Sequence, residues 1–258
     1  MLLGREQRCN PNLSALERFY ISILGMPIIG LRIRGRNIFS LIPKDREYKA
    51  ILDAGSGTGV FSFELAKRFP KAQIIGIDIL KNVVNAGNDI AKKINAQNVK
   101  FIHGNLESLN FRDKFDLIVC VDILEHIEND IRALQILNEY LTPSGTLVLH
   151  VPALYRRYPV FKKNFNFDVE THVRVGYELS EIRNKSENAG FTIKQIGFTY
   201  GFWETLANNL SYMITRARME NKMLYACAFP FLNLLSLIGS KSRPKKIGAG
   251  IYIIGQKS

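Results

Sequence analysis

The sequence predicts an α/β protein whose helices cover both faces of a mostly parallel, doubly wound sheet. From residue 49 to about 151, short apolar segments typical of strands alternate with segments that have the apolar spacing of helices. A glycine-rich turn joins the first of these strands to the first helix. The chain has 258 residues, of which 47% are hydrophobic, so it can bury a full core in one large domain with an insertion or appendage.

The boundaries of the elements follow from hydrophobic spacing and from turn residues. We expect strands at 49–53, 73–78, 98–103, 114–121, 145–151, 192–198 and 250–256. We expect helices at 60–69, 81–96 and 129–141, and a further helix of about ten residues that ends before Gly190. The Thr-Pro-Ser-Gly run at 142–145 favours a turn and should stop the third of these helices.

A long apolar insertion, at 199–249, separates the last two expected strands. Residues 224–238 carry no charge, but this run is shorter than a bilayer-spanning helix and Pro230 should break it. The basic residues that flank it are Arg216, Arg218, Lys222, Lys241, Arg243, Lys245 and Lys246. An apolar segment with cationic borders is typical of a helix that lies in an anionic membrane surface. A helical lid or a dimer interface is the alternative.

An N-terminal helical segment at 1–46 repeats this pattern and is a second candidate for membrane contact. Residues 19–29 are mostly apolar, and Arg32, Arg34 and Arg36 alternate with other residues directly after them. The rest of the chain, 47–258, would then be one domain that contains the apolar insertion. Neither apolar stretch is a convincing transmembrane span.

Charge and cysteine content restrict the possible partners and the compartment. The chain has 35 basic and 23 acidic residues, a net charge of +12, which suits a lipid headgroup layer, nucleic acid or an acidic small molecule. Cys9, Cys120 and Cys227 are odd in number and include no CxxC pair, which argues against a disulfide framework or a cysteine zinc site. We therefore expect a cytoplasmic protein, and the N-terminus lacks the pattern of a secretory signal.

The glycine-rich turn indicates a nucleotide-like ligand. Asp53 ends the first strand, and the glycines that follow have the spacing G-x-G-x-G, whereas the dinucleotide fingerprint is G-x-G-x-x-G. A carboxylate at this position would repel a pyrophosphate and attract a cationic ligand, so the pattern argues against NAD. The next strand also ends in an acid, Asp78.

The combination of strand, D-x-G-x-G-x-G, helix and second acid resembles the class I S-adenosylmethionine (SAM) methyltransferases. The resemblance implies a sheet of order 3-2-1-4-5-7-6 whose seventh strand is antiparallel, with Asp78 on the ribose hydroxyls and Asn105 on the adenine. A plain turn residue is the alternative for Asn105. The expected cofactor-binding residues are Asp53, Gly55, Ser56, Gly57, Gly59, Asp78, Ile79, Asn105, Leu106 and Val121.

A group of polar residues after the fourth strand is the expected reaction site. Asp122, Glu125 and His126 are spaced i, i+3 and i+4, so one helical turn would gather them, and His172 follows in a later loop. They could provide a general base with its orienting acid, or ligands for a hard divalent ion. A helix N-terminus with a capping acid and a buried histidine is the alternative.

This group resembles the E-x-x-E-H and later histidine of ubiquinone-biosynthesis O-methyltransferases and, more loosely, of small-RNA 2′-O-methyltransferases. Asp122 stands where that pattern has its first Glu. We expect His126, His172 and Asp122 to be catalytic. No metal is firmly assigned, and the ligands of a divalent ion would be Asp122, Glu125, His126 and His172.

The expected function is methyl transfer from SAM to a hydroxyl of a small or lipid-like acceptor, at the inner face of a membrane. An RNA methyltransferase ranks lower, because the basic residues follow apolar stretches and do not alternate with aromatic ones. A non-catalytic SAM-binding protein is an alternative from another class. The sequence does not indicate the oligomeric state or the identity of the acceptor.

Overall fold

A computed structural model describes residues 2–108, 111, 114–154, 171–215, 221–240 and 248–257. The strands are β1 (Ala50–Ala54), β2 (Gln73–Asp78), β3 (Val99–His103), β4 (Phe115–Val121), β5 (Leu141–Pro152), β6 (Phe191–Thr199) and β7 (Gly250–Lys257). The helices are α1 (Ala15–Leu24), α2 (Ile29–Leu41), α3 (Val60–Arg68), α4 (Lys81–Lys93), α5 (Asp130–Tyr140), α6 (Leu179–Asn188), α7 (Phe202–Thr215) and α8 (Lys222–Gly239). Three short 3-10 helices are η1 (Arg5–Cys9), η2 (Leu106–Ser108) and η3 (Leu124–His126).

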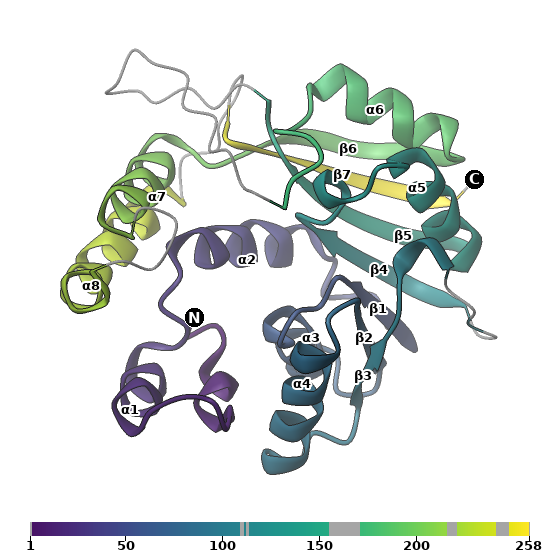
Figure 1. Cartoon of the computed structure of the whole chain (residues 1–258). Coiled ribbons are helices and arrows are strands. Elements are labelled where there is room, and N and C mark those ends of the chain that lie inside the picture. Colours follow the sequence, from purple (N-terminus) through teal and green to yellow (C-terminus); the bar gives the residue numbers. More distant parts are fainter. Residues whose placement is uncertain are drawn as a thin grey trace.

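The strands form one sheet of order β3-β2-β1-β4-β5-β7-β6 (Figure 1), which confirms the expected fold. Strands β1 to β5 pair in parallel, and β7 runs antiparallel to both β5 and β6. Parallel pairing sets the ends of neighbouring strands side by side: Asp53 is in register with Gly76, and Asp78 with His103. The carboxyl ends of β1 to β5 therefore share one edge, where ligands bind in open α/β sheets.

Alternate residues of the central strands pack into two different cores. Leu117 and Val119 of β4 lie in the core under α3 and α4, whereas Ile118 and Cys120 lie in the core under α5 and α6. All four side chains are fully buried. Both faces of the sheet are thus covered by helices, as continuous apolar strands of this kind require.

A helical unit made of α1, α2, α7 and α8 lies beside the carboxyl edge of the sheet (Figure 1). Its own core joins Ile29 and Ile33 of α2 to Tyr225 and Phe229 of α8. Helix α2 contacts α7 and α8 as well as β5. The N-terminal segment and the insertion before β7, far apart in the sequence, therefore pack together as one unit.

Pro230 does not break α8, so that expectation is wrong. The helix continues from Lys222 to Gly239 although Pro230 has no N–H to donate to the carbonyl of Ala226, four residues before it. The Tyr20 hydroxyl of α1 donates to that carbonyl instead, with an O···O distance of 2.6 Å. The contact satisfies a backbone acceptor that proline leaves open, and it fixes α1 against α8.

Helix α8 is, within the part of the chain that the structure describes, the one helix long and apolar enough by length and composition to cross a membrane. Only 28% of its 18-residue window is buried in the protein. Met223, Leu224, Phe231, Leu234 and Ile238 are all exposed. Most of the apolar surface of α8 thus faces away from its own core.

The arginines of α2 point into the protein and therefore do not form the cationic border that the sequence pattern of the N-terminal segment suggested. The Arg32 guanidinium is buried, donates to the carbonyls of Leu24 and Met26, and lies over the Phe229 ring. Arg36 donates to the Ser236 hydroxyl of α8 at 2.9 Å. Buried cations need such partners, and α2 is consequently an internal helix of the unit.

The start of β5 also differs from the expectation. The strand begins at Leu141, although the expected turn at 142–145 separates a helix from a strand at 145–151. Its pairing with β4 changes register between Phe115 and Leu117, and Ser144 has a positive φ of 60°. The turn residues therefore form an irregularity inside the strand.

We expect Tyr20→Phe to lower the free energy of unfolding by about 1 kcal/mol, because the Ala226 carbonyl would lose its donor. Equilibrium denaturation of the parent and the variant measures this change. Tyr252→Phe is the matched control, since no hydrogen bond of its hydroxyl is found among the described residues. In a Pro230→Ala background, which restores the N–H of the helix, the cost of Tyr20→Phe should be smaller; an equal cost in both backgrounds would contradict this explanation.

Candidate functional site

The glycine turn is tied to the end of β2 by backbone hydrogen bonds. The N–H groups of Gly55 and Ser56 both donate to the carbonyl of Ile77, each at 2.9 Å. The N–H of Gly57 donates to the Asp78 carboxylate at 2.8 Å. The turn and the second acid, which the sequence predicted separately, therefore form one structure.

Two glycines of this turn serve different purposes. Gly55 has a φ of 79°, and a Cβ there would lie 2.0 Å from Cδ1 of Ile123, so only glycine fits. Gly57 has a φ of 52°, yet a Cβ there would meet no atom within 4 Å. Tight packing explains Gly55, whereas the open side of Gly57 leaves room for a ligand to approach the backbone.

Asp78 is placed to hold hydroxyl groups. One carboxylate oxygen accepts from Gly57 and the other from the N–H of Leu80, at 2.9 Å, which fixes the orientation of the carboxylate. Each oxygen keeps a second lone pair. A vicinal diol such as that of a ribose could donate to both, so the arrangement fits the role that the resemblance implies.

Asp53 is buried, with 3% of its surface exposed, and accepts a hydrogen bond from the Ser62 hydroxyl of α3 at 2.5 Å. Burial raises its pKa to about 6, and the hydrogen bonds from Ser62 only partly oppose this effect. Sequence analysis expected Asp53 to attract a cationic ligand but missed Ser62. The carboxylate belongs to the support beneath the glycine turn.

The other expected cofactor residues lie along the same edge of the sheet. Asn105 accepts from the N–H of Glu107 at 3.0 Å, so its side chain makes the turn contact that was the alternative for it. Ile79 is exposed, Leu106 is buried, and Val121 ends β4. Polar backbone groups, Asp78 and the exposed apolar Ile79 together fit a nucleoside with a cationic substituent, as in SAM.

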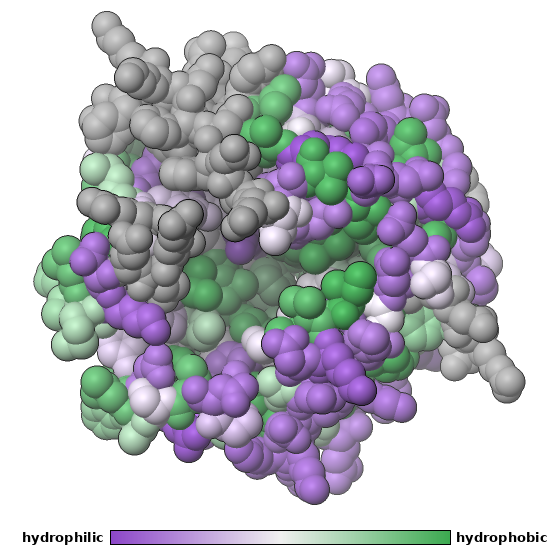
Figure 2. All heavy atoms as spheres, viewed as in Figure 1, coloured by the Kyte–Doolittle hydropathy of each residue, from purple (hydrophilic) through white to green (hydrophobic). Residues whose placement is uncertain are grey.

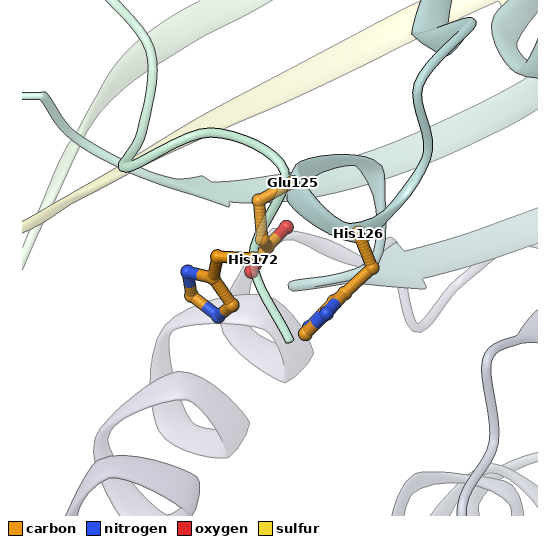
Figure 3. A group of neighbouring side chains, drawn as sticks. All are labelled: Glu125, His126 and His172. Atoms are coloured by element: carbon orange, nitrogen blue, oxygen red, sulfur yellow. The ribbon is translucent and has the colours of Figure 1, made fainter. Parts of the chain in front are cut away.

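A second cluster lies farther along the same edge and consists of Glu125, His126 and His172 (Figure 3). One possible ligand atom from each residue lies within 4.8 Å of the other two. The two imidazole rings meet edge to face, with their centroids 4.6 Å apart. Glu125 is buried and His126 is exposed, so the cluster reaches from the core to the surface.

Arg174 brings His172 to this cluster. Its guanidinium donates to the carbonyls of Leu124, Ile127 and Glu128, at 2.8, 2.7 and 2.9 Å, around the η3 turn. The N–H of Val173 donates to the carbonyl of Glu125 at 2.9 Å. Sequence analysis missed Arg174; its position two residues after His172 is the only feature that could have indicated it.

The hydrogen bond of His126 determines what its ring can do. Nδ1 lies 2.9 Å from the Thr171 carbonyl, which can only accept, so the neutral ring carries its proton on Nδ1. Nε2 then keeps its lone pair. His126 can therefore act as a general base or as a ligand for a divalent ion, and its neighbours can assist in either role.

Asp122 does not join this cluster, so the expectation that one helical turn gathers Asp122, Glu125 and His126 is wrong. Asp122 has a φ of 52°, and η3 begins only at Leu124. Its carboxylate lies 3.0 Å from Nη1 of Arg34 and 2.6 Å from Nδ1 of His150. In the described part of the chain, the group that could hold an ion is Glu125, His126 and His172.

We expect Asp53→Asn to stabilise the ligand-free protein at neutral pH. Because the pKa is raised, the folded state holds the proton more tightly than the unfolded chain, and the free energy of unfolding falls as the pH rises from about 4 to about 6. Asparagine removes this loss, on the order of 1 to 3 kcal/mol at pH 7.5. Denaturation at pH 7.5 and pH 3.5 measures it, with Asp45→Asn as the exposed control. A variant less stable than the parent at pH 7.5 would contradict the argument.

A family model described as a methyltransferase domain matches residues 45–215, about two thirds of the chain. Among curated proteins, the chain is 34% identical over 121 residues to a trans-aconitate 2-methyltransferase of Deinococcus radiodurans, covering 46% of this chain and 43% of that protein. It is 32% identical over 123 residues to the mitochondrial ubiquinone biosynthesis O-methyltransferase of Schizosaccharomyces pombe, covering 45% of this chain and 40% of that protein. The chain thus spans less than half the length of these two relatives.

A solved structure supports the fold over nearly the whole chain. The O-methyltransferase of a trans-AT PKS multienzyme from Brevibacillus brevis, in complex with S-adenosyl-L-homocysteine, superposes with a TM-score of 0.58 at 19% identity. The superposition covers 98% of this chain and 78% of that one. The likeness therefore extends to the helical unit, which the family model does not cover completely.

Proposed function

The chain belongs to the methyltransferase-domain family, and from this premise we propose that it transfers a methyl group from SAM to a hydroxyl of a small or lipid-like acceptor. One observation carries the proposal. The glycine turn with Asp78 and the cluster with His126 lie on the same edge of the sheet, and His126 keeps a lone pair at Nε2. The proposed cofactor site and the proposed base thus share this edge.

SAM supplies a methyl group that its sulfonium has already activated, so the protein has to align the acceptor and remove a proton. Nε2 of His126 would accept the hydroxyl proton. The Thr171 carbonyl, which holds Nδ1–H, would stabilise the imidazolium that results. His172 and Glu125 border the same space and would orient the acceptor.

The same three side chains are also a candidate site for a divalent ion. One carboxylate and two imidazoles are suitable ligands, and their ligand atoms lie within 4.8 Å of one another. We place the general base first, because Asp122, the fourth ligand expected for an ion, pairs with Arg34 and His150 and does not belong to this group. An activity that survives removal of divalent ions by a chelator would support this order.

The names of the relatives support a small-molecule acceptor. Trans-aconitate and the ubiquinone pathway appear in the names of two of them. A lipid-like acceptor agrees with the apolar helical unit beside the reaction site. RNA remains the main rival substrate because of the net charge of +12, and a non-catalytic SAM-binding protein is the rival from another class.

We further propose that α1 and α8 place the protein on an anionic membrane surface in the cytoplasm. Leu16, Phe19 and Ile23 form an exposed stripe on α1, and Phe231 and Leu234 belong to the exposed face of the adjacent α8. Figure 2 shows hydrophobic residues on the side of the molecule where α1 and α8 lie. Such a face is typical of interfacial helices.

Charge supports an anionic bilayer as the partner of this face. Arg18 and Lys222 are exposed on α1 and at the start of α8. The other basic residues that flank the insertion in the sequence lie outside the described residues. A net charge of +12 favours lipid headgroups of negative charge.

Labelled SAM tests the cofactor, the base and the acceptor class together. We expect label from the parent in the lipid or small-molecule fraction of a cell extract. Asp78→Ala should lose SAM binding at least tenfold because the ribose loses its acceptor, whereas His172→Ala should bind SAM normally and transfer at least tenfold more slowly. Label found only in RNA would overturn the proposed acceptor class. SAM binding without label in any fraction would favour a non-catalytic SAM-binding protein. Unchanged SAM binding by Asp78→Ala would overturn the proposed cofactor site.

Vesicle binding tests the membrane surface. The parent should co-sediment with vesicles that contain phosphatidylglycerol and much less with pure phosphatidylcholine. Replacing both Phe19 and Phe231 by serine should weaken binding at least tenfold, because each ring contributes roughly 1.5 to 3 kcal/mol when it is buried. Ile131→Ser, an exposed position on α5, is the control. A parent that ignores vesicles but dimerises through Phe19 and Phe231 would assign this face to a second copy.

A further inference from the structure

A hydrogen-bonded network of polar side chains connects the helical unit to the carboxyl edge of the sheet. Nη1 of Arg34, on α2, lies 3.0 Å from one carboxylate oxygen of Asp122. Nδ1 of His150 lies 2.6 Å from the other oxygen. Nε2 of His150 lies 2.8 Å from the Thr199 hydroxyl at the end of β6. Asp122, the residue that follows β4, is thus linked directly to α2 and β5, and through His150 to β6.

The proton positions in this network follow from which groups can donate a hydrogen bond and which can only accept one. A carboxylate only accepts, so Nδ1 of neutral His150 carries the proton and donates to Asp122. Nε2 then accepts from the Thr199 hydroxyl. Both nitrogens of the neutral ring are satisfied, and the positive charge beside Asp122 comes from Arg34. A cation and an N–H donor on the same carboxylate favour its ionised form.

The four side chains of this network differ in how exposed they are. Asp122 and Arg34 have 23% and 24% of their side chains exposed, whereas His150 and Thr199 are buried. A Cβ at Gly250 would lie 2.5 Å from both Nε2 of His150 and the Thr199 hydroxyl, so glycine leaves the space for that hydrogen bond. Asp122 and Arg34 are thus the partly exposed end of this network, and His150 and Thr199 support Asp122 from the interior.

The backbone of Asp122 is fixed in a conformation that aspartate rarely adopts. Its φ is 52°, and its N–H donates to the carbonyl of His150 at 2.9 Å. Left-handed residues other than glycine concentrate at functional sites, because the surroundings have to hold them. Burial would lower the pKa of Arg34, but the Asp122 carboxylate, together with Tyr200 and Tyr212, more than offsets this and raises it. The two side chains are therefore strongly coupled.

We propose that Arg34 is a positioning residue for the transfer reaction, which holds Asp122 toward the acceptor. The proposal rests on the proposed function. Asp122 directly follows β4 at the carboxyl edge of the sheet, where it would orient the acceptor hydroxyl. Arg34, which also donates to the Tyr200 hydroxyl at 3.4 Å, would act through Asp122. The N-terminal helix α2 thus completes a site that is otherwise built by the sheet.

A purely structural ion pair would not explain this arrangement. Both side chains of the pair are partly exposed, and α2 is already held by the buried Ile29 and Ile33. The ion pair and the side-chain hydrogen bond of Arg34 go to Asp122 and Tyr200, neither of which belongs to the glycine turn. Loss of Arg34 should therefore change the rate of transfer while SAM binding and stability stay near those of the parent.

A double-mutant cycle tests the proposal. We expect Arg34→Met to lower kcat at least tenfold with the Kd for SAM changed less than twofold, and Arg34→Lys to restore part of the rate. In an Asp122→Asn background, Arg34→Met should cause little further loss, because the carboxylate that it positions is gone. Arg132→Met, which removes an exposed ion pair with Glu139 on α5, is the control. Additive losses, or an equal loss of SAM binding, would overturn the role of Arg34.

A measurement that needs no methyl acceptor tests the role of Arg34 independently of the proposed function. The Nδ1–H resonance of His150 in ¹⁵N NMR reports its hydrogen bond to Asp122. We expect Arg34→Met to shift this resonance and Arg132→Met to leave it unchanged. If the parent transferred no methyl group but the shift occurred, the coupling of Arg34 to Asp122 would stand and the proposed function would fail. An unshifted resonance would overturn the positioning of Asp122 by Arg34.

Discussion

Parallel pairing of β1 to β5 is the constraint on which the rest of the molecule depends. It sets the carboxyl ends of these strands at one edge, so that residues distant in sequence become neighbours there. The glycine turn can then donate to Asp78, at the end of the next strand. Asp122 and His150 meet at the ends of β4 and β5 for the same reason.

The second constraint is that charged side chains removed from water need hydrogen-bond or charge partners. Arg32, Arg34 and Arg36 leave α2 in three directions, toward α8, the carboxyl edge of the sheet, and the α7–α8 pair. Each guanidinium has at least one partner outside α2, which offsets part of the cost of removing the cation from water. Helix α2 is therefore joined through its arginines to both the sheet and the helical unit.

The helical unit has one face turned inward and another turned outward. Inside, Tyr20 completes the hydrogen bonding of α8 at the carbonyl that Pro230 leaves open. Outside, apolar residues of α1 and α8 remain exposed. Arg34 links this unit to Asp122. The exposed apolar face of α1 and α8 is therefore connected, through the helical unit, to a side chain at the carboxyl edge of the sheet.

The sequence by itself determined the sheet, its strand order through a family resemblance, and the glycine turn with Asp78, because these features depend on local patterns of apolar, glycine and acidic residues. It also brought His126 and His172 forward as one candidate group, although their contact depends on Arg174. Only the tertiary structure decided the partners of Asp122, the inward direction of the α2 arginines and the continuity of α8 through Pro230. Those depend on a left-handed backbone at Asp122 and on donors that lie far away in the sequence, such as Tyr20 and Arg34, which no spacing rule can supply.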